Sequence, residues 1–225
     1  MPLSKEGRKR MKLAELSERS GLPAATIKYY LREQLLPPGR RITATQAEYG
    51  DDHLRRLRLV RALIQVGRMP VATARQVLAA VEDESLDQNT RLGAAVWALP
   101  QGPKPVEDDP ATAVARREVE LLMRRLAWQE CLDAGEEAPA WATLVVAVSA
   151  LVRLGYPCDA DDLAPYARAA AQLAVTDLDL VEGFSTPLEQ VEAAVALTVL
   201  YEPVLLSLRR LAEAEESNRR FGTGD

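Results

Sequence analysis

The chain has 225 residues, 48% of them hydrophobic, and a formal net charge of -5, which predicts a soluble protein with one compact domain and a smaller module. Its longest strongly apolar run, 141–152, is shorter than the roughly 20 residues that span a bilayer, and its start lacks the apolar segment of an export signal. We therefore expect a cytoplasmic protein. Its two cysteines, Cys131 and Cys158, form no CxxC motif, so we expect buried structural thiols in a reducing compartment.

Charge is divided unevenly along the chain. Residues 1–82 hold 16 Lys and Arg against 8 Asp and Glu, whereas residues 83–225 hold 12 against 25. A basic module attached to an acidic body indicates that the first part meets a polyanion and the second does not.

Apolar residues recur at helical spacing almost throughout, and alternating β-branched runs are nearly absent. The fold class that we predict is all-α with one small β-hairpin: an N-terminal winged helix-turn-helix and a C-terminal helical bundle. In the first part the predicted elements are helices at 12–19, from Pro23 to before Pro37, from Asp51 or Asp52 to Gly67 and at 70–82, with the hairpin at 40–49.

In the second part a short helix is expected within 86–99, followed by a linker at 100–110 rich in proline and charge. A helix at 111–132 and a buried central helix at 139–154 come next, and Asp159 caps another. Thr186, Pro187 and Glu189 have the spacing of a capping box, so a last helix begins there and continues past Pro203 with a kink. The predicted domains are a tail at 1–10, a DNA-binding domain at 11–82, a connecting segment at 83–110 and an effector and dimerisation domain at 111–220.

The helix after Pro23 has two different faces. Ala24, Ile27 and Leu31 share one face and should pack against the first helix. The opposite face carries small residues, cations and a phenol, with Tyr30 at the border: Ala25, Thr26, Lys28, Tyr29 and Arg32. Two short helices joined by a glycine turn, the second with this surface, are typical of a helix-turn-helix whose second helix enters the DNA major groove. A plain helical hairpin with a basic exterior is the alternative.

Further cations adjoin this surface. Arg40 and Arg41 lie on the predicted hairpin, where a wing would hold both beside the DNA backbone. The third helix adds four arginines, several of which would serve only as its solvated face: Arg55, Arg56, Arg58 and Arg61.

The sequence MKLAELSERSGLPAATIKYYLREQLLPPG, followed by DDHLRRLRLVRALIQVG and VATARQVL, resembles the MerR family of winged-helix transcription regulators over residues 11–82. Pro23 replaces the usual cap, and 45–48 replaces the usual wing turn. The resemblance implies a regulator that binds an inverted repeat in a promoter, distorts the duplex and acts on RNA polymerase there. The DNA-binding residues that we predict are Lys12, Ala25, Thr26, Lys28, Tyr29, Tyr30, Arg32, Arg40, Arg41 and Tyr49.

Members of this family dimerise through a long helix directly after the fourth one. Gly93 and Pro100 interrupt that place here, so a homodimer would use either 111–132 or 187–210. For an effector we expect an apolar small molecule among the C-terminal helices, with speculative contacts from Trp128, Trp141, Tyr166, Tyr201 and Glu202.

No catalytic set is evident, because the only histidine, His53, lies in the basic module, where it would face phosphate or solvent. We expect no metal site and no cofactor. The alternative function is that of an enzyme or a helical partner-binding protein that uses the helix-turn-helix-like module for protein contact.

Overall fold

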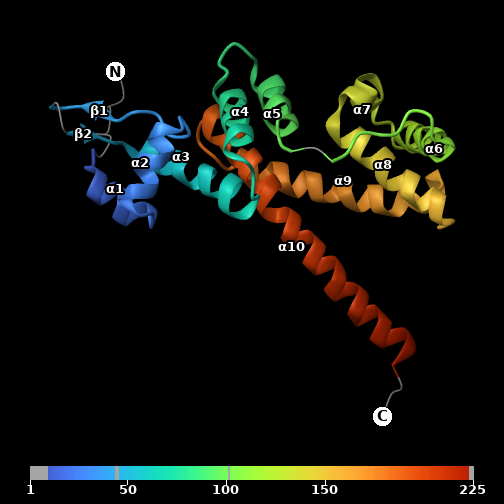
Figure 1. The fold of residues 1–225 in the computed structure, drawn as a ribbon. Coiled ribbons are helices and arrows are strands. Elements are labelled where there is room, and N and C mark those ends of the chain that lie inside the picture. Colours follow the sequence, from blue (N-terminus) through green and yellow to red (C-terminus); the bar gives the residue numbers. More distant parts are fainter. Residues whose placement is uncertain (1–9, 44–45, 101, 223–225) are drawn as a thin grey trace, which may run out of the picture. The chain divides into compact units, whose positions relative to one another are not determined.

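The computed structural model describes residues 10–43, 46–100 and 102–222. The chain forms two compact units, one made of Met1–Val96 together with Phe184–Asp225 and the other of Trp97–Gly183. Both consist of helices, apart from one two-stranded antiparallel hairpin among the described residues. The predicted fold class, all-α with a small hairpin, is therefore confirmed (Figure 1).

The first unit begins with a helix-turn-helix and a hairpin. The elements are α1 (Leu13–Ser20), α2 (Ala24–Arg32), β1 (Arg40–Arg41), β2 (Ala47–Glu48), α3 (Asp51–Arg61), the π-helical turn η1 (Ala62–Val66), α4 (Val71–Glu82), most of α5 (Gln88–Trp97) and α10 (Pro187–Phe221). Leu16 of α1, Ile27 of α2 and Leu57 of α3 are fully buried. The apolar face predicted for α2 thus packs into a core shared with its neighbours.

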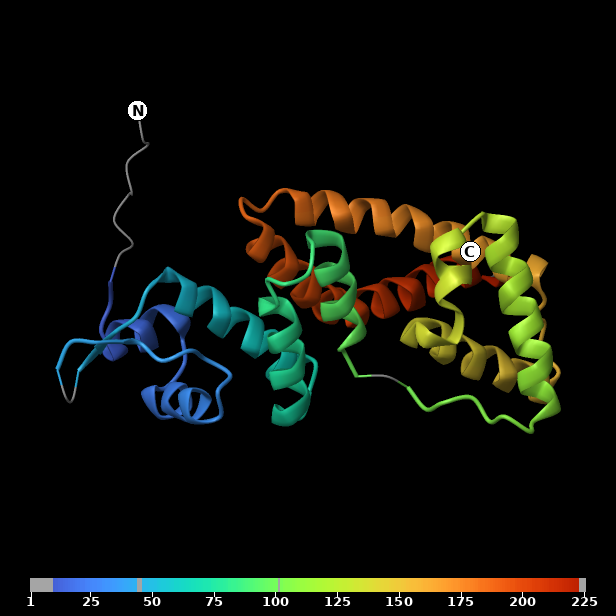
Figure 2. The same ribbon diagram turned by 90° about the horizontal axis from the view of Figure 1, so that it is seen from above.

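Two glycines allow the tight connections of this module. Gly21, between α1 and α2, has a φ of 67°, a left-handed conformation that glycine adopts without strain. Gly39 precedes β1, and a Cβ there would lie 2.8 Å from both the carbonyl oxygen of Glu48 and the ring of Tyr49. Arg40 pairs with Glu48 and Arg41 with Ala47 in the hairpin, which projects from α1–α3 in Figure 2.

The long helix α10 belongs to the first unit through its N-terminal half. Val191, Val195 and Val199 are buried, and this half packs on α3, η1 and α4. Its C-terminal half extends beyond the other helices of that unit (Figure 1). The predicted domain at 111–220 included 187–220. The structure places this helix in the first unit instead, because these valines complete the core of that unit.

The cap predicted for α10 is present, since Thr186 Oγ1 accepts a hydrogen bond from the Glu189 backbone N–H at 3.2 Å. The helix runs through Pro203 without a break. By length and composition α10 is long and apolar enough to cross a membrane, which is weak evidence because core helices of soluble proteins meet the same test. A second candidate in the described part of the chain requires counting Gln129–Glu137 and Pro139–Leu154 as one span bent by 81°.

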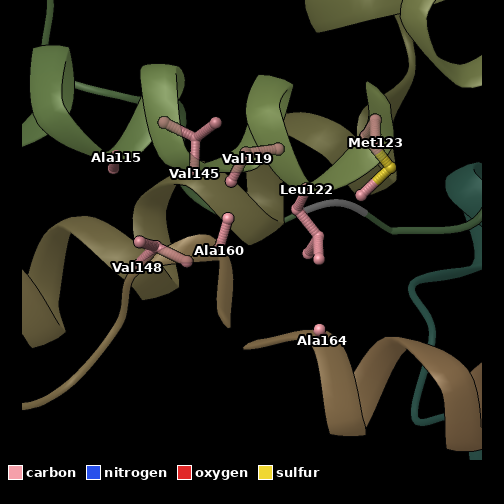
Figure 3. Close-up of a cluster of buried hydrophobic side chains, with 8 residues drawn as sticks. All are labelled: Ala115, Val119, Leu122, Met123, Val145, Val148, Ala160 and Ala164. Carbon is pink, nitrogen blue, oxygen red and sulfur yellow. The ribbon is translucent and has the colours of Figure 1, made fainter. Parts of the chain in front are cut away.

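The second unit is a small helical bundle. Its elements are α6 (Pro110–Leu126), α7 (Gln129–Ala134), the 3-10 turn η2 (Gly135–Glu137), α8 (Pro139–Leu154) and α9 (Ala160–Glu182). The close-up in Figure 3 shows Val119 and Leu122 of α6, Val145 and Val148 of α8 and Ala164 of α9 in one buried cluster. Asp109 and Asp159 cap α6 and α9 through hydrogen bonds from backbone N–H groups to their carboxylates.

Two expectations for this unit were wrong. The helix expected at 111–132 ends at Leu126, because Ala127 adopts a left-handed conformation with a φ of 56° and turns the chain into α7. The helix at 139–154 is not buried all round, since Leu154 is 71% exposed.

Candidate nucleic-acid interface

The outward face of α2 is the most clearly exposed part of the predicted site. Ala25, Lys28, Tyr29 and Arg32 are exposed and Thr26 is half-buried, whereas Ile27 on the opposite face is fully buried. The fold therefore presents these predicted residues together on one side of the helix. Ala25 and Thr26, near the start of this face, have small side chains, so a nucleic-acid backbone is able to approach the helix closely there.

On this face Arg32 has contacts with neighbouring side chains, whereas Lys28 has no ion-pair partner among the described residues. The Arg32 guanidinium lies 5.3 Å from the centre of the Tyr29 ring and 3.6 Å from the Glu33 carboxylate. Within the described ranges, Lys28 has no carboxylate within 4.0 Å, and neither does Lys12, which is also exposed. Their ammonium groups are available to a phosphate without the loss of an ion pair.

The structure places the rings of two of the predicted DNA-binding tyrosines in the core. Tyr30 is 4% exposed and Tyr49 is 7% exposed, so both rings belong to the core. Burial raises the pKa of Tyr30 and of Tyr49. Tyr49 also forms a backbone bridge with Met11, with N–H to O distances of 2.9 Å in both directions. The rings of these two residues therefore support the fold, and a contact of their hydroxyl groups with DNA stays a prediction.

The hairpin contributes one paired and one unpaired arginine. Arg40 Nη2 lies 3.0 Å from Glu48 Oε2, and Arg10 lies 3.6 Å from the same oxygen. Arg41 is exposed and has no carboxylate within 4.0 Å in the part of the chain that the structure describes. Of the wing turn at 45–48, residue 45 lies outside the described residues. Arg41 is thus the hairpin cation most available to an anion.

Three of the four arginines of α3 hold the module together. Arg61 Nη1 donates to the Ser20 carbonyl oxygen at 3.0 Å, at the end of α1. Arg56 is buried and donates from Nε to the Leu35 carbonyl oxygen at 3.1 Å. Arg55 contacts Asp52 at 3.0 Å and, at 3.4 Å, Glu189 of α10. The carbonyl acceptors of Arg56 and Arg61 could not be predicted from the sequence, because only tertiary packing brings them close to these arginines.

His53 has a structural role that differs from the expected contact with phosphate or solvent. Its Nδ1 accepts a hydrogen bond from the Gly50 backbone N–H at 3.1 Å, which satisfies a donor at the start of α3. The ring packs edge-on against Tyr49, with a centroid distance of 5.1 Å. Burial lowers the pKa of His53. The ring is therefore held neutral as a helix cap.

The residues predicted for an effector fall in two different units. Trp128 and Trp141 are half-buried against the core of the second unit, and Tyr166 on α9 is 61% exposed. Tyr201 and Glu202 are exposed on α10 of the first unit. The structure thus does not gather the five into one site within either unit.

The cysteines differ from the expectation of buried thiols, because Cys131 is exposed and Cys158 is half-buried. Both side chains are free thiols.

A basic helix-turn-helix with an adjoining hairpin defines a winged-helix DNA-binding regulator. Residues 11–81 match the family model described as MerR HTH family regulatory protein. The chain is also similar to the crystal structure of SCO5550 from Streptomyces coelicolor A3(2), described as a proposed transcriptional regulator. The two share 54% identity with a TM-score of 0.83, over 96% of this chain and 100% of that one. A search of curated proteins found no match. The chain belongs to the MerR family of DNA-binding transcription regulators.

Proposed function

We propose that this regulator binds an inverted-repeat promoter site as a cytoplasmic homodimer, distorts the duplex between the half-sites and thereby controls RNA polymerase. The observation that carries the proposal is the exposed face of α2, where Lys28 is unpaired among the described residues and Arg32 stacks on Tyr29. On a dimer, two such helices would enter successive major grooves.

The residues divide by the contacts that suit them. Ala25 and Thr26, near the start of α2, are small enough for the helix to approach base edges, and Arg32 is able to read a guanine in a bidentate contact. Lys12, Lys28 and Arg41 are exposed cations suited to phosphates on either side of that groove. Phosphate contacts would fix the position of the protein, and base contacts would select the sequence.

The proposed distortion of DNA is based on the positions of the elements that would contact it. Two recognition helices and two hairpins hold the outer parts of the site and leave its centre uncontacted. Bending such a centre costs of order 1 to 6 kcal/mol, which the additional phosphate contacts are able to offset. Whether the protein represses or activates transcription then depends on which shape of the bound DNA, bent or straight, is favoured.

Circular-permutation electrophoresis on a selected genomic site tests this mechanism. We expect mobility to vary with the position of the site in the fragment, together with hypersensitivity to cleavage at the site's centre. Specific binding to DNA that stays straight and is uniformly protected would refute distortion and leave promoter occlusion.

We also propose that the second unit senses an apolar small molecule. A cavity of about 630 Å³ in that unit is lined by Trp141, Leu132 and Ala127 on one side and by four polar or charged residues on the other, Glu120, Arg124, Gln129 and Asp133. An apolar ring would lie against Trp141 and Leu132. A ligand would alter transcription only by binding the two DNA-bound states with different affinities. Titration with the amphiphilic anionic dye 1-anilinonaphthalene-8-sulfonate, whose aromatic rings would contact Trp141, should give saturable binding that Trp141→Ala weakens about tenfold. Equal binding by both proteins would refute this site.

A further inference from the structure

The first unit contains a cavity of its own, of about 280 Å³, between α3 and the N-terminal half of α10. This volume is close to the lower limit of about 300 Å³ for small-molecule sites, so a ligand that fills the cavity is small. The cavity is separate from the one proposed above for an effector, whose lining residues all belong to the second unit.

One end of this cavity is apolar. Leu59 and Ala62, both buried, line it from α3, and α10 contributes Ala193, Ala196 and Leu197. The spacing of three or four residues places each set on one face of its helix. No side chain at this end carries a polar atom, so the end suits an aliphatic or aromatic group.

The other end of the cavity carries charges of both signs. Two residues of α3 and two of α10, each one turn before the apolar residues of its helix, line it: Arg55, Arg58, Glu189 and Glu192. Arg55 Nη1 lies 3.4 Å from Glu189 Oε1. Further along both helices, a Cβ added at Gly67 would lie 2.8 Å from Val199 Cγ1. The two helices therefore advance in the same direction, and their charged residues meet at the same end of the cavity.

Two of these four charged side chains are poorly paired. Arg58 is exposed, and among the described residues no carboxylate lies within 4.0 Å of it. The Glu192 side chain is only 13% exposed, and its contact with Arg55 Nε is long, at 3.6 Å. Arg55 also contacts the carboxylates of Asp52 and Glu189. Burial raises the pKa of Glu192, so a further cation beside this residue would stabilise its charged form.

One small molecule is able to reach both of these charges. Arg58 follows Arg55 by three residues, about 4.5 Å along α3, and Arg55 is the residue that contacts Glu192. A ligand with only an amine would leave Arg58 without an anion. A ligand with only a carboxylate would place a second negative charge beside Glu192. A zwitterion satisfies both side chains and matches an end with two arginines and two glutamates.

We propose that this cavity binds an apolar α-amino acid. The ammonium group of the ligand pairs with Glu192, its carboxylate pairs with Arg58, and its side chain lies against Leu59 and Ala196. Because Arg61 of α3 also holds the Ser20 carbonyl oxygen at the end of α1, occupancy of the cavity would act on the helix-turn-helix within the first unit. That consequence for DNA binding rests on the proposed function, whereas the binding site does not.

Isothermal titration calorimetry of the full chain tests the ligand class. We expect one L-leucine or L-phenylalanine to bind per chain. Two analogues of leucine, 4-methylpentanoate without the ammonium group and 3-methylbutylamine without the carboxylate, should bind at least about tenfold more weakly, because each loses a charge-assisted hydrogen bond. L-serine, with a polar side chain, should bind more weakly than either amino acid. Absence of binding by both apolar amino acids, or equal binding by leucine and either analogue, would overturn the proposal.

Two variants test the assigned contacts. Arg58→Gln should weaken leucine binding at least about tenfold and no longer distinguish leucine from 3-methylbutylamine. Glu192→Gln should weaken it similarly and no longer distinguish leucine from 4-methylpentanoate. A merely structural effect would weaken all three ligands alike, and that result would overturn these contacts.

Arg68→Gln is the matched control, since it removes one positive charge from an exposed position of the first unit outside the cavity and should leave leucine binding unchanged. Weakening by Arg68→Gln as large as that by Arg58→Gln would show a general charge effect and overturn the site. Duplex binding by a wild-type protein that binds no amino acid would overturn this site and leave the proposed function standing.

Discussion

Arg56 Nε donates a hydrogen bond to the carbonyl oxygen of Leu35 at 3.1 Å, from the middle of α3 to the turn that follows the recognition helix. The guanidinium is buried, and its Nη2 also lies 2.8 Å from Glu82 of α4. A single side chain therefore ties α3, α4 and the end of the α2 segment together.

Replacing this arginine should destabilise the first unit. Arg56→Met retains the apolar stem but leaves the Leu35 carbonyl without its donor, so we expect the free energy of unfolding to fall by about 1 to 3 kcal/mol in urea denaturation. Arg58→Met is the matched control, because Arg58 is exposed on the same helix and should change stability by less than about 0.5 kcal/mol. Equal stability of the two variants would show that the buried hydrogen bond contributes nothing.

The recognition surface was predictable because a helix of known start fixes which residues share a face. Ile27 inward and Lys28 outward follow from 3.6-residue periodicity alone. Tyr30, at the border of the two faces, was assigned to the DNA surface by resemblance, and the fold places it inside. Periodicity cannot decide a border position, since packing by other segments determines whether it is covered.

The position of α10 could not be predicted from the sequence, for a related reason. Val191, Val195 and Val199 predict a buried stripe, but not which distant helices bury it. The chain leaves the first unit after α5 and returns about 90 residues later, so neighbourhood in sequence was misleading.

Lys28→Ala should reduce the salt dependence of DNA binding. Each phosphate contact releases counterions, so losing one should lower the slope of log affinity against log salt by about one on duplexes of any sequence. Fluorescence anisotropy between 50 and 200 mM salt on a random-sequence duplex measures this slope. Lys104→Ala removes the same charge from an exposed position outside the DNA-binding module and should leave the slope as it is. An unchanged slope for Lys28→Ala would exclude a phosphate contact by that residue.

His53 should make the first unit less stable in mild acid. Burial lowers the pKa of His53 in the folded state, so the unfolded chain, with an ordinary value of about 6.5, takes up the proton first. The stability provided by the neutral ring is complete above about pH 6.5 and is lost as the pH falls through the lower folded value.

Two measurements check this effect. Since His53 is the only histidine, its imidazole NMR signal reports the folded pKa directly, and we expect a midpoint below 6.5. Between pH 7.5 and 5.5 the free energy of unfolding should fall less in His53→Asn than in the wild type. Glu192, whose raised pKa acts in the opposite direction, is present in both proteins and does not affect their difference. A folded midpoint above 6.5 would contradict the prediction.

Replacing Gly67 and replacing Gly93 by alanine should have opposite effects on the stability of the first unit. A Cβ at Gly67 would lie 2.8 Å from both the Leu63 carbonyl oxygen and Val199 Cγ1, where α10 meets the end of η1. Because neither backbone nor a buried valine yields easily, Gly67→Ala should destabilise the unit by about 1 to 3 kcal/mol. Gly93 lies inside α5 with nothing within 4 Å of an added Cβ, so Gly93→Ala should stabilise it by about 0.5 to 1 kcal/mol. Thermal denaturation followed by circular dichroism distinguishes the two, and a stabilised Gly67→Ala would mean that α10 does not approach η1 as closely as the structure has it.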